Sequence, residues 1–239
     1  MSYIIDFNGY KALRPLNYIM RLRGTPYGVV DLSSCNSIEQ HDVITTNQST
    51  LGSDRQLKFN GTSSYIYITH TKNKIDTGED FTLSLWVIQE NMSRDRQVQF
   101  YFGYVGEYFE SYPSFYMVQS NYITNYPNSY VISFGYHYQL GFAYPFIQNT
   151  PFQTPFHLAV VRKNGVTKCA MNGIFSNDSL SVNTDFLRVG SKESIGKASR
   201  GSFNYAYADM VLDDFCIIKG RALWTSDFTP PTEYLPDKW

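Results

Sequence analysis

The sequence is poor in cysteine, in tryptophan and in charge. Its 239 residues include 3 Cys and 3 Trp, and 20 Lys+Arg against 21 Asp+Glu leave a net charge of −1. The cysteines, Cys35, Cys169 and Cys216, are odd in number and widely spaced. This spacing excludes a disulfide framework or a zinc knuckle and predicts free thiols in a reducing compartment. Nucleic-acid binding needs a basic excess that is missing here, so we expect no nucleic-acid partner.

Long apolar runs and helical periodicity are also missing. No apolar run approaches the roughly 20 residues of a membrane-spanning helix, so we expect no membrane insertion. The opening residues, MSYIIDFNGY, lack a basic start and a long apolar core. They are therefore not expected to be a signal peptide. The best helical candidate is Arg221–Trp224, which predicts one short turn at most.

Alternation of apolar and polar residues is the dominant pattern, and it predicts strands. In the stretch FTLSLWV we expect Phe81, Leu83, Leu85 and Val87 to share the core face. Asn164-Gly165 is the strongest hairpin signal in the chain. Many short strands separated by Gly, Asn, Ser and Pro turns indicate a sandwich or a barrel. Further strands are predicted at Tyr65–Thr69, Phe156–Arg162, Val166–Met171, Phe186–Val189 and Met210–Ile218.

Two segments differ from this pattern. Residues 10–28 are more basic than the rest, which predicts either a surface loop with solvated charges or a docking arm for a partner. Residues 100–146 are dense in Tyr and Phe, with Asn, Ser and Gln between them. They predict strands and loops whose Tyr rings cover the sheet, or else a recognition surface. Tyr suits recognition because it offers contact area and a hydroxyl at low entropic cost.

The end of the sequence resembles a known signature. Leu212–Trp224 reads LDDFCIIKGRALW and Phe228–Thr232 reads FTPPT. Together they resemble the C-terminal motif of the concanavalin A-like, laminin-G-like jelly rolls, in which a D-D-F/V-R-I strand leads to K-G-x-A-x-Y/W and then F-T-P-P-T. Earlier segments resemble other parts of that family in the same order: Tyr3–Gly9 its opening strand, Val30–Ser34, Leu57–Ile66, Gly78–Val87, Phe156–Gly173 and Leu187–Gly190.

The resemblance implies an all-β fold, a two-sheet antiparallel jelly-roll β-sandwich. It covers residues 1–239 as a single domain, with a basic insertion at 10–28 and a Tyr-rich insertion at 100–150. The FTPPT ending is similar to that of modules in tailed-bacteriophage structural and fibre proteins, and it also occurs in bacterial surface proteins.

Catalytic patterns are missing. Some concanavalin A-like relatives are glucanases, whose carboxyls share one strand face, but no glutamate here begins the alternating E-x-D-x-E pattern. Glu107 and Glu110 are three residues apart and fall on opposite faces of a strand. No G-x-S-x-G elbow occurs, and no histidine, His157 on a predicted strand included, shows a recognisable Ser or Cys partner. We expect no enzyme, and a glycosidase is the discounted alternative.

Calcium is the one cofactor that the resemblance brings into consideration. Many relatives hold a structural Ca²⁺ near the last strand, and the matching ligand here is Asp214, or less well Asp213, with Asp31 as a contributor. Asn8 and Asn60 stand where relatives often carry Asp, which weakens the match. The alternative is that Asp214 caps turn N–H groups or pairs with Arg or Lys without a metal.

Two functions remain after these exclusions. The first is a non-enzymatic virion protein of a tailed bacteriophage, as capsid decoration, head fibre or tail component, assembled in the host cytoplasm and displayed on the virion surface. Its partners are other virion proteins, copies of itself and, as a further role, host surface glycans. The second is a secreted or cell-surface carbohydrate-binding module of bacterial origin. The expected partner contacts are Arg14, Arg21, Arg23 and Trp239, and the expected glycan-binding residues are Tyr122, Asn125, Tyr126, Asn128 and Tyr130.

Overall fold

The computed structural model describes part of the 239-residue chain. The described residues are 4–5, 11–12, 16–33, 35–46, 51, 55–70, 75–91, 97–102, 114–120, 129–135, 146–147, 151–177, 179–181, 192–197 and 207–237. For the strands between 97 and 147, the description is limited to their backbone pairing.

The described residues form strands joined by turns, without a helix. In chain order they are β1 Ile4–Ile5, β2 Lys11–Ala12, β3 Tyr18–Thr25, β4 Gly28–Asp31, β5 Asn36–His41, β6 Ile44–Thr45, β7 Leu57–Asn60, β8 Tyr65–His70, β9 Phe81–Gln89, β10 Gln97–Phe102, β11 Ser114–Ser120, β12 Ser129–Gly135, β13 Phe146–Ile147, β14 Phe156–Lys163, β15 Val166–Met171, β16 Ile174–Phe175, β17 Leu180–Ser181, β18 Lys192–Ile195 and β19 Asp209–Lys219.

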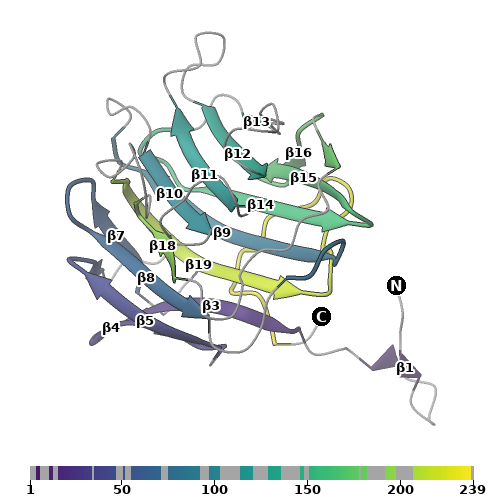
Figure 1. Cartoon of the computed structure of the whole chain (residues 1–239), viewed down its shortest axis with the longest axis horizontal. Coiled ribbons are helices and arrows are strands. Elements are labelled where there is room, and N and C mark those ends of the chain that lie inside the picture. The colour runs from purple at the N-terminus through teal and green to yellow at the C-terminus, as the bar shows by residue number, and fades with distance from the viewer. Residues whose placement is uncertain are drawn as a thin grey trace.

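Two antiparallel sheets make up the molecule, as the two layers of Figure 1 show. One has seven strands in the order β13-β12-β11-β10-β18-β8-β5. The other has ten strands along the path β16-β15-β14-β9-β19-β3-β4, with β6, β7 and β17 off this path. Neighbouring strands are often distant in sequence, because the chain crosses between the layers as in a jelly roll. The predicted all-β, two-sheet antiparallel sandwich is confirmed.

The core lies between the two sheets and follows the predicted alternation. Phe81, Leu83, Leu85 and Val87 of β9 are all at most 1% exposed and belong to one apolar cluster. The seven-stranded sheet contributes the inward residues of β8 and β18, while the alternate residues of β8 point away from the core. The predicted hairpin between β14 and β15 also forms, with positive φ at Asn164 and Gly165.

The outer face of the ten-stranded sheet is covered by the C-terminal segment, residues 220–237. In Figure 1 its yellow trace runs across the sheet that contains β14, β9 and β19. Trp224 and Leu235 of this segment are buried against Ala159, Val161 and Ile218 in a second apolar cluster. The FTPPT region is therefore part of the packing of the domain.

The described residues 16–28 of the basic segment do not form a surface loop or an arm, so this expectation was wrong for them. Tyr18–Thr25 is the full strand β3, which pairs with β19 on one side and with β4 on the other. Its inward residues Ile19, Met20 and Leu22 are buried in the core. Met20 and Leu22 alternate with Arg21 and Arg23. The segment therefore forms a strand with an apolar inner face, although its composition is basic.

Two smaller expectations also differ from the structure. Arg221–Trp224 forms bends and no helical turn, because its residues pack onto the outer sheet face. Ile4–Ile5, in the expected opening strand, pairs with β2 in a separate two-stranded sheet. The expected strand Phe186–Val189 lies outside the described residues.

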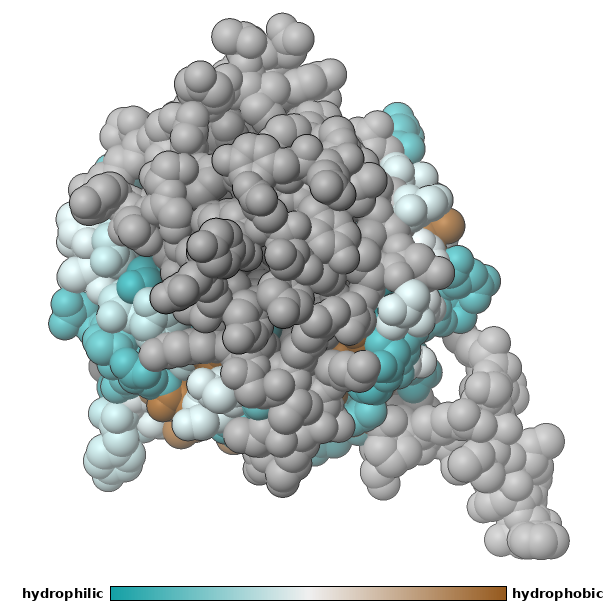
Figure 2. Space-filling view, in the orientation of Figure 1, coloured by the Kyte–Doolittle hydropathy of each residue, from teal (hydrophilic) through white to brown (hydrophobic). Residues whose placement is uncertain are grey.

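The described surface is largely polar. In the view of Figure 2 it is mostly hydrophilic or neutral, with small separate hydrophobic spots. Cys35, Cys169 and Cys216 are buried free thiols, as predicted, and burial raises the pKa of Cys169 and Cys216. Within the described ranges no helix is long and apolar enough to cross a membrane.

Candidate functional site

Most of the predicted glycan-binding residues lie outside the described part of the chain. Tyr122, Asn125, Tyr126 and Asn128 belong to the stretch 121–128, and Tyr130 is placed only through the backbone of β12. Their assignment stays a prediction. The paired catalytic candidates Glu107 and Glu110 are likewise outside the described residues.

Asp214 lies at a bulge in the middle of the ten-stranded sheet. Between Asp213 and Cys216 the register of β19 against β9 shifts, and Asp214 has a φ of 46°. Its carboxylate pairs with the Arg23 guanidinium at 2.9 Å, and both side chains are at most 5% exposed. Burial raises the pKa of Asp214 to about 6, although Arg23 lowers it. The ion-pair alternative to a calcium ligand is the one observed.

The two aspartates proposed as calcium ligands are used by protein donors. Asp31 accepts hydrogen bonds from the backbone N–H groups of Arg21 and Ser33, the Ser33 hydroxyl and the Asn36 amide. Asp214 accepts from Leu235 N–H at 3.3 Å and holds the Arg23 guanidinium. Calcium takes six to eight oxygens and would lie beside that guanidinium, so these side chains do not fit a calcium ion.

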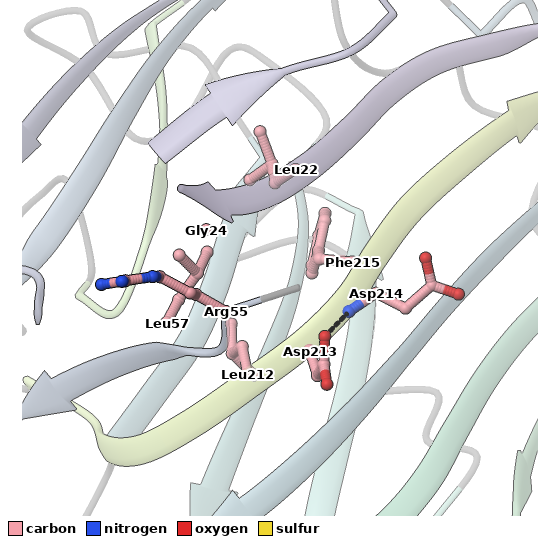
Figure 3. A pocket seen from close by; sticks show the side chains of 8 residues that line it. All are labelled: Leu22, Gly24, Arg55, Leu57, Leu212, Asp213, Asp214 and Phe215. Atoms are coloured by element: carbon pink, nitrogen blue, oxygen red, sulfur yellow. Dashed lines mark hydrogen bonds between the residues drawn. The ribbon is translucent and has the colours of Figure 1, made fainter. Parts of the chain in front are cut away.

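A small pocket lies beside Asp214, where β19 changes partner from β7 to β3. Figure 3 shows the aliphatic lining of Leu22, Leu57 and Leu212, with the Asp214 carboxylate pointing away from them. The backbones of Gly24 and Arg55 close its mouth, and a Cβ at Gly24 would collide with the Arg55 carbonyl. The pocket is too narrow to admit a water molecule and is a packing defect at the fork of the sheet.

The arginines expected to contact partners bind this chain instead, where the structure describes them. Arg23 is 5% exposed and lies over the Tyr234 ring at 3.3 Å, so its prediction as a partner contact was wrong. Arg21 pairs with Asp237 at 2.6 Å and donates to the Leu235 carbonyl, which holds the C-terminal segment to β3. Arg14 and Trp239 lie outside the described residues and remain predictions.

His157 has a serine partner that the sequence did not reveal. Ser84 Oγ and His157 Nε2 are 2.9 Å apart across β9 and β14. Trp224 and Phe228 stack on each other and close over the imidazole, so that His157 is 0% exposed and burial lowers its pKa to about 3. Because no substrate reaches this pair, it stabilises the packing beneath the C-terminal segment and forms no catalytic dyad.

The seven-stranded sheet presents a different arrangement on its outer face, which we call the aromatic patch. It consists of Glu39, His41, Tyr65, Tyr67, Lys197 and Tyr207. β5 and β8 supply four of these residues in register, with Glu39 opposite Tyr67 and His41 opposite Tyr65. Ile66 and Ile68 of β8 are buried, so the alternating tyrosines face outward.

Tyr65 stands at the centre of the aromatic patch. The His41 ring stacks on it with centroids 4.2 Å apart, and the Lys197 Nζ lies 3.5 Å from the Tyr65 centroid. Two groups this close to one ring must occupy its opposite faces. Tyr67 meets Tyr65 edge-on at 4.8 Å, and Tyr207 lies 6.3 Å away at a tilt. The patch therefore combines half-buried rings, phenol groups and one cation on the outer face of the seven-stranded sheet.

The aromatic patch was missed for a definite reason. The YIYIT motif predicted only a strand, and its alternation of Tyr and Ile is the one signal in the sequence that could have indicated a row of tyrosines on one face. Lys197 and Tyr207 are far from β8 in the sequence. Only the pairing of β18 with β8 brings Lys197 near Tyr67.

Comparison with known proteins places the fold in a class. No protein-family model and no curated protein sequence matches this chain. Solved structures match it as β-sandwich domains at low identity, which concerns the fold alone. One is domain 4 of AbnA, a GH43 extracellular arabinanase from Geobacillus stearothermophilus, in complex with arabinotriose. Its TM-score is 0.56 at 14% identity, covering 87% of this chain and 95% of that one.

Other matches are botulinum neurotoxin binding domains. The serotype D binding domain has a TM-score of 0.58 at 13% identity, covering 87% of this chain and 50% of that chain. Neurotoxin type C, whose cell entry depends on interaction with two ganglioside molecules, has a TM-score of 0.59 at 14% identity, covering 92% and 49%. The chain thus spans about half the length of these neurotoxin chains.

Proposed function

We propose that this protein is a non-enzymatic glycan-binding protein whose binding surface is the aromatic patch. The observation that carries the proposal is the gathering of three tyrosines, a histidine and a lysine on one open sheet face. Aromatic rings pack against the apolar faces of sugars, while phenol and ammonium groups bond sugar hydroxyls. Solved β-sandwich structures that match the fold, one of them in complex with arabinotriose, lend support.

The chemistry of the aromatic patch favours binding over hydrolysis. Glycoside cleavage needs two carboxyls, about 5–9.5 Å apart according to mechanism. The patch contains a single carboxylate, that of Glu39, and it pairs with His41 at 2.7 Å. We therefore expect no release of reducing sugar from polysaccharides. Release that Glu107→Gln or Glu110→Gln abolishes would contradict the non-enzymatic proposal.

The experiment for the binding surface compares tyrosines inside and outside the patch. Glycan-array binding of the intact protein is expected to fall at least tenfold in Tyr67→Ala and in Tyr207→Ala. Tyr27→Ala is the matched control, because Tyr27 is 95% exposed and lies in the turn between β3 and β4. Equal losses in the control, or binding unaffected by both patch substitutions, would move the site elsewhere, with the stretch 121–128 as the next candidate.

For the setting of this activity, we propose display on the particle of a tailed bacteriophage, as capsid decoration, head fibre or tail component. The similarity of the ending FTPPT, Phe228–Thr232, to that of modules in phage structural and fibre proteins supports it. The runner-up is a secreted or cell-surface carbohydrate-binding module. Mass spectrometry of purified particles decides between them: tens to hundreds of copies per particle are expected, and absence from particles would favour the runner-up.

A further inference from the structure

Lys197 differs from other described lysines in what its ammonium contacts. Lys163 pairs with Asp80 at 2.6 Å, and Lys219 pairs with Glu79 and Asp76 at 3.2 and 3.3 Å. The Lys197 Nζ instead lies 3.5, 4.7 and 5.8 Å from the centroids of Tyr65, Tyr67 and Tyr207. With the described residues it makes no hydrogen bond or ion pair, so its contacts there are with the faces of rings.

This environment holds the cation without using its donors. Ring quadrupoles attract an ammonium that lies over their faces, and the ammonium keeps its three N–H groups for oxygen acceptors. The ammonium thus lies beside the tyrosines, and its N–H groups can donate to an oxygen of a ligand. An anionic group is the acceptor that gains most, because a charge-assisted hydrogen bond is about twice as strong as a neutral one.

The backbone beneath Lys197 is fixed in place. Gly196 has a φ of 85°, and a Cβ there would collide with the Phe59 ring of the core. The Lys197 carbonyl accepts the Ser194 hydroxyl at 2.7 Å, and the Gly196 carbonyl accepts Ala208 N–H at 2.8 Å. The Lys197 side chain therefore starts from a fixed backbone turn, so little backbone entropy is lost when it binds a ligand.

The one carboxylate in the patch does not cancel this charge. Glu39 pairs with His41, and His41 covers the face of Tyr65 opposite to Lys197. The Tyr65 ring consequently separates the Glu39–His41 pair from the ammonium. Since both faces of Tyr65 are occupied, we expect the sugar to pack on Tyr67 or Tyr207.

We infer that the aromatic patch selects glycans bearing an anionic group, a carboxylate or a sulfate ester, and that Lys197 is the residue that recognises it. The sugar ring packs on Tyr67 or Tyr207 while the anion accepts hydrogen bonds from Nζ. This inference rests on the proposed glycan-binding function and adds its charge selectivity. Affinity should fall as salt rises, because the ion pair forms at a partly solvated surface.

The test uses matched glycan triplets on an array: a neutral oligosaccharide, its sialylated or uronate-bearing form and its sulfated form. We expect the intact protein to bind at least one anionic form at least tenfold more tightly than its neutral core, and the preferred form identifies the source of the anion. Lys197→Gln should lower binding of the anionic form at least tenfold and binding of the neutral form much less, so that the preference is lost, while Lys197→Arg should keep the preference. Lys168→Gln is the control, since Lys168 is an exposed lysine of the other sheet.

The outcomes separate the two proposals. Equal binding of neutral and anionic forms, with losses in Tyr67→Ala, would overturn the charge selectivity and leave glycan binding in place. A preference that survives in Lys197→Gln would assign the anion to another residue and would also overturn the inference. Binding to no glycan in any form would overturn both.

Discussion

The outer faces of the two sheets of this protein differ in how far they are covered. The ten-stranded sheet is covered by residues 220–237, and even its polar outer residues Ser84 and His157 are at most 1% exposed. The seven-stranded sheet leaves His41, Tyr65 and Tyr67 half-buried on an open face. A face covered by its own chain buries its polar groups away from any ligand, whereas the half-buried face of the other sheet keeps rings and an ammonium within reach of one. The comparison explains why the Ser84–His157 pair is structural and the aromatic patch is the candidate site.

The largest effect on stability is expected from removing the Trp224 side chain, which helps to cover the ten-stranded sheet. Trp224 is 8% exposed, stacks on Phe228 at 4.1 Å and packs edge-on to His157. Trp224→Ala should lower the free energy of unfolding by about 3–5 kcal/mol, measured by urea denaturation. Ile174→Ala is the control, because Ile174 is 61% exposed. A near-wild-type midpoint for Trp224→Ala would mean that the segment covers the sheet without stabilising it.

The core shared by both sheets is tested at Leu85. Its side chain is 0% exposed in the cluster between the layers, so Leu85→Ala should cost about 2–5 kcal/mol of unfolding free energy. Leu32→Ala provides the comparison, since Leu32 is 56% exposed and should change stability by at most about 0.5 kcal/mol. Equal stability of the two variants would show that β9 presents its other face to the core.

The buried charge of the ten-stranded sheet predicts that stability depends on pH. Burial raises the pKa of Asp214 from 3.8 to about 6, so folding favours the protonated carboxyl. The stability from Asp214 is therefore fully present below about pH 4 and is lost as pH rises through 6, by about 3 kcal/mol.

The measurement is the difference in unfolding free energy between wild type and Asp214→Asn from pH 4 to 8. The wild type should gain relative to the variant as pH falls. Burial lowers the pKa of His70 to about 4 and of His157 to about 3, so both histidines lose stability below pH 6.5. They do so in both proteins, and their effect cancels in the difference. A difference independent of pH would show that Arg23 compensates the burial of Asp214.

The smallest stability effect is expected on the open face. Tyr67→Ala should change the free energy of unfolding by about 1 kcal/mol or less, because the side chain is half-buried and packs on neighbouring surface rings. Thermal unfolding beside the glycan-binding assay separates the two roles of this residue. A large loss of stability would show that Tyr67 is a packing residue. Tyr207 would then be the ring to test for glycan binding.

Prediction from sequence succeeded where a local pattern and the burial of a residue coincide. The alternation at 81–87 and the Asn164-Gly165 turn carry their structural meaning in a few residues, and both form as expected. It failed at residues 10–28, where four basic residues favoured a loop or a docking arm although Tyr18–Thr25 has the apolar alternation of a strand. A charge on an outward strand position is solvated only if nothing covers that face, and here Arg23 is covered by Tyr234.

Composition and periodicity predicted an all-β sandwich or barrel of short strands with free thiols, because strand alternation and turn chemistry are local properties, and the resemblance of the C-terminal signature favoured the sandwich. Which outer face is sealed and which is open was decided by tertiary contacts alone. Residues 220–237 cover β9, β14 and β19, and β18 carries Lys197 to tyrosines of β8 some 130 positions earlier in the chain. Such contacts join residues whose sequence separation bears no relation to their distance in space, so no pattern along the chain encodes them.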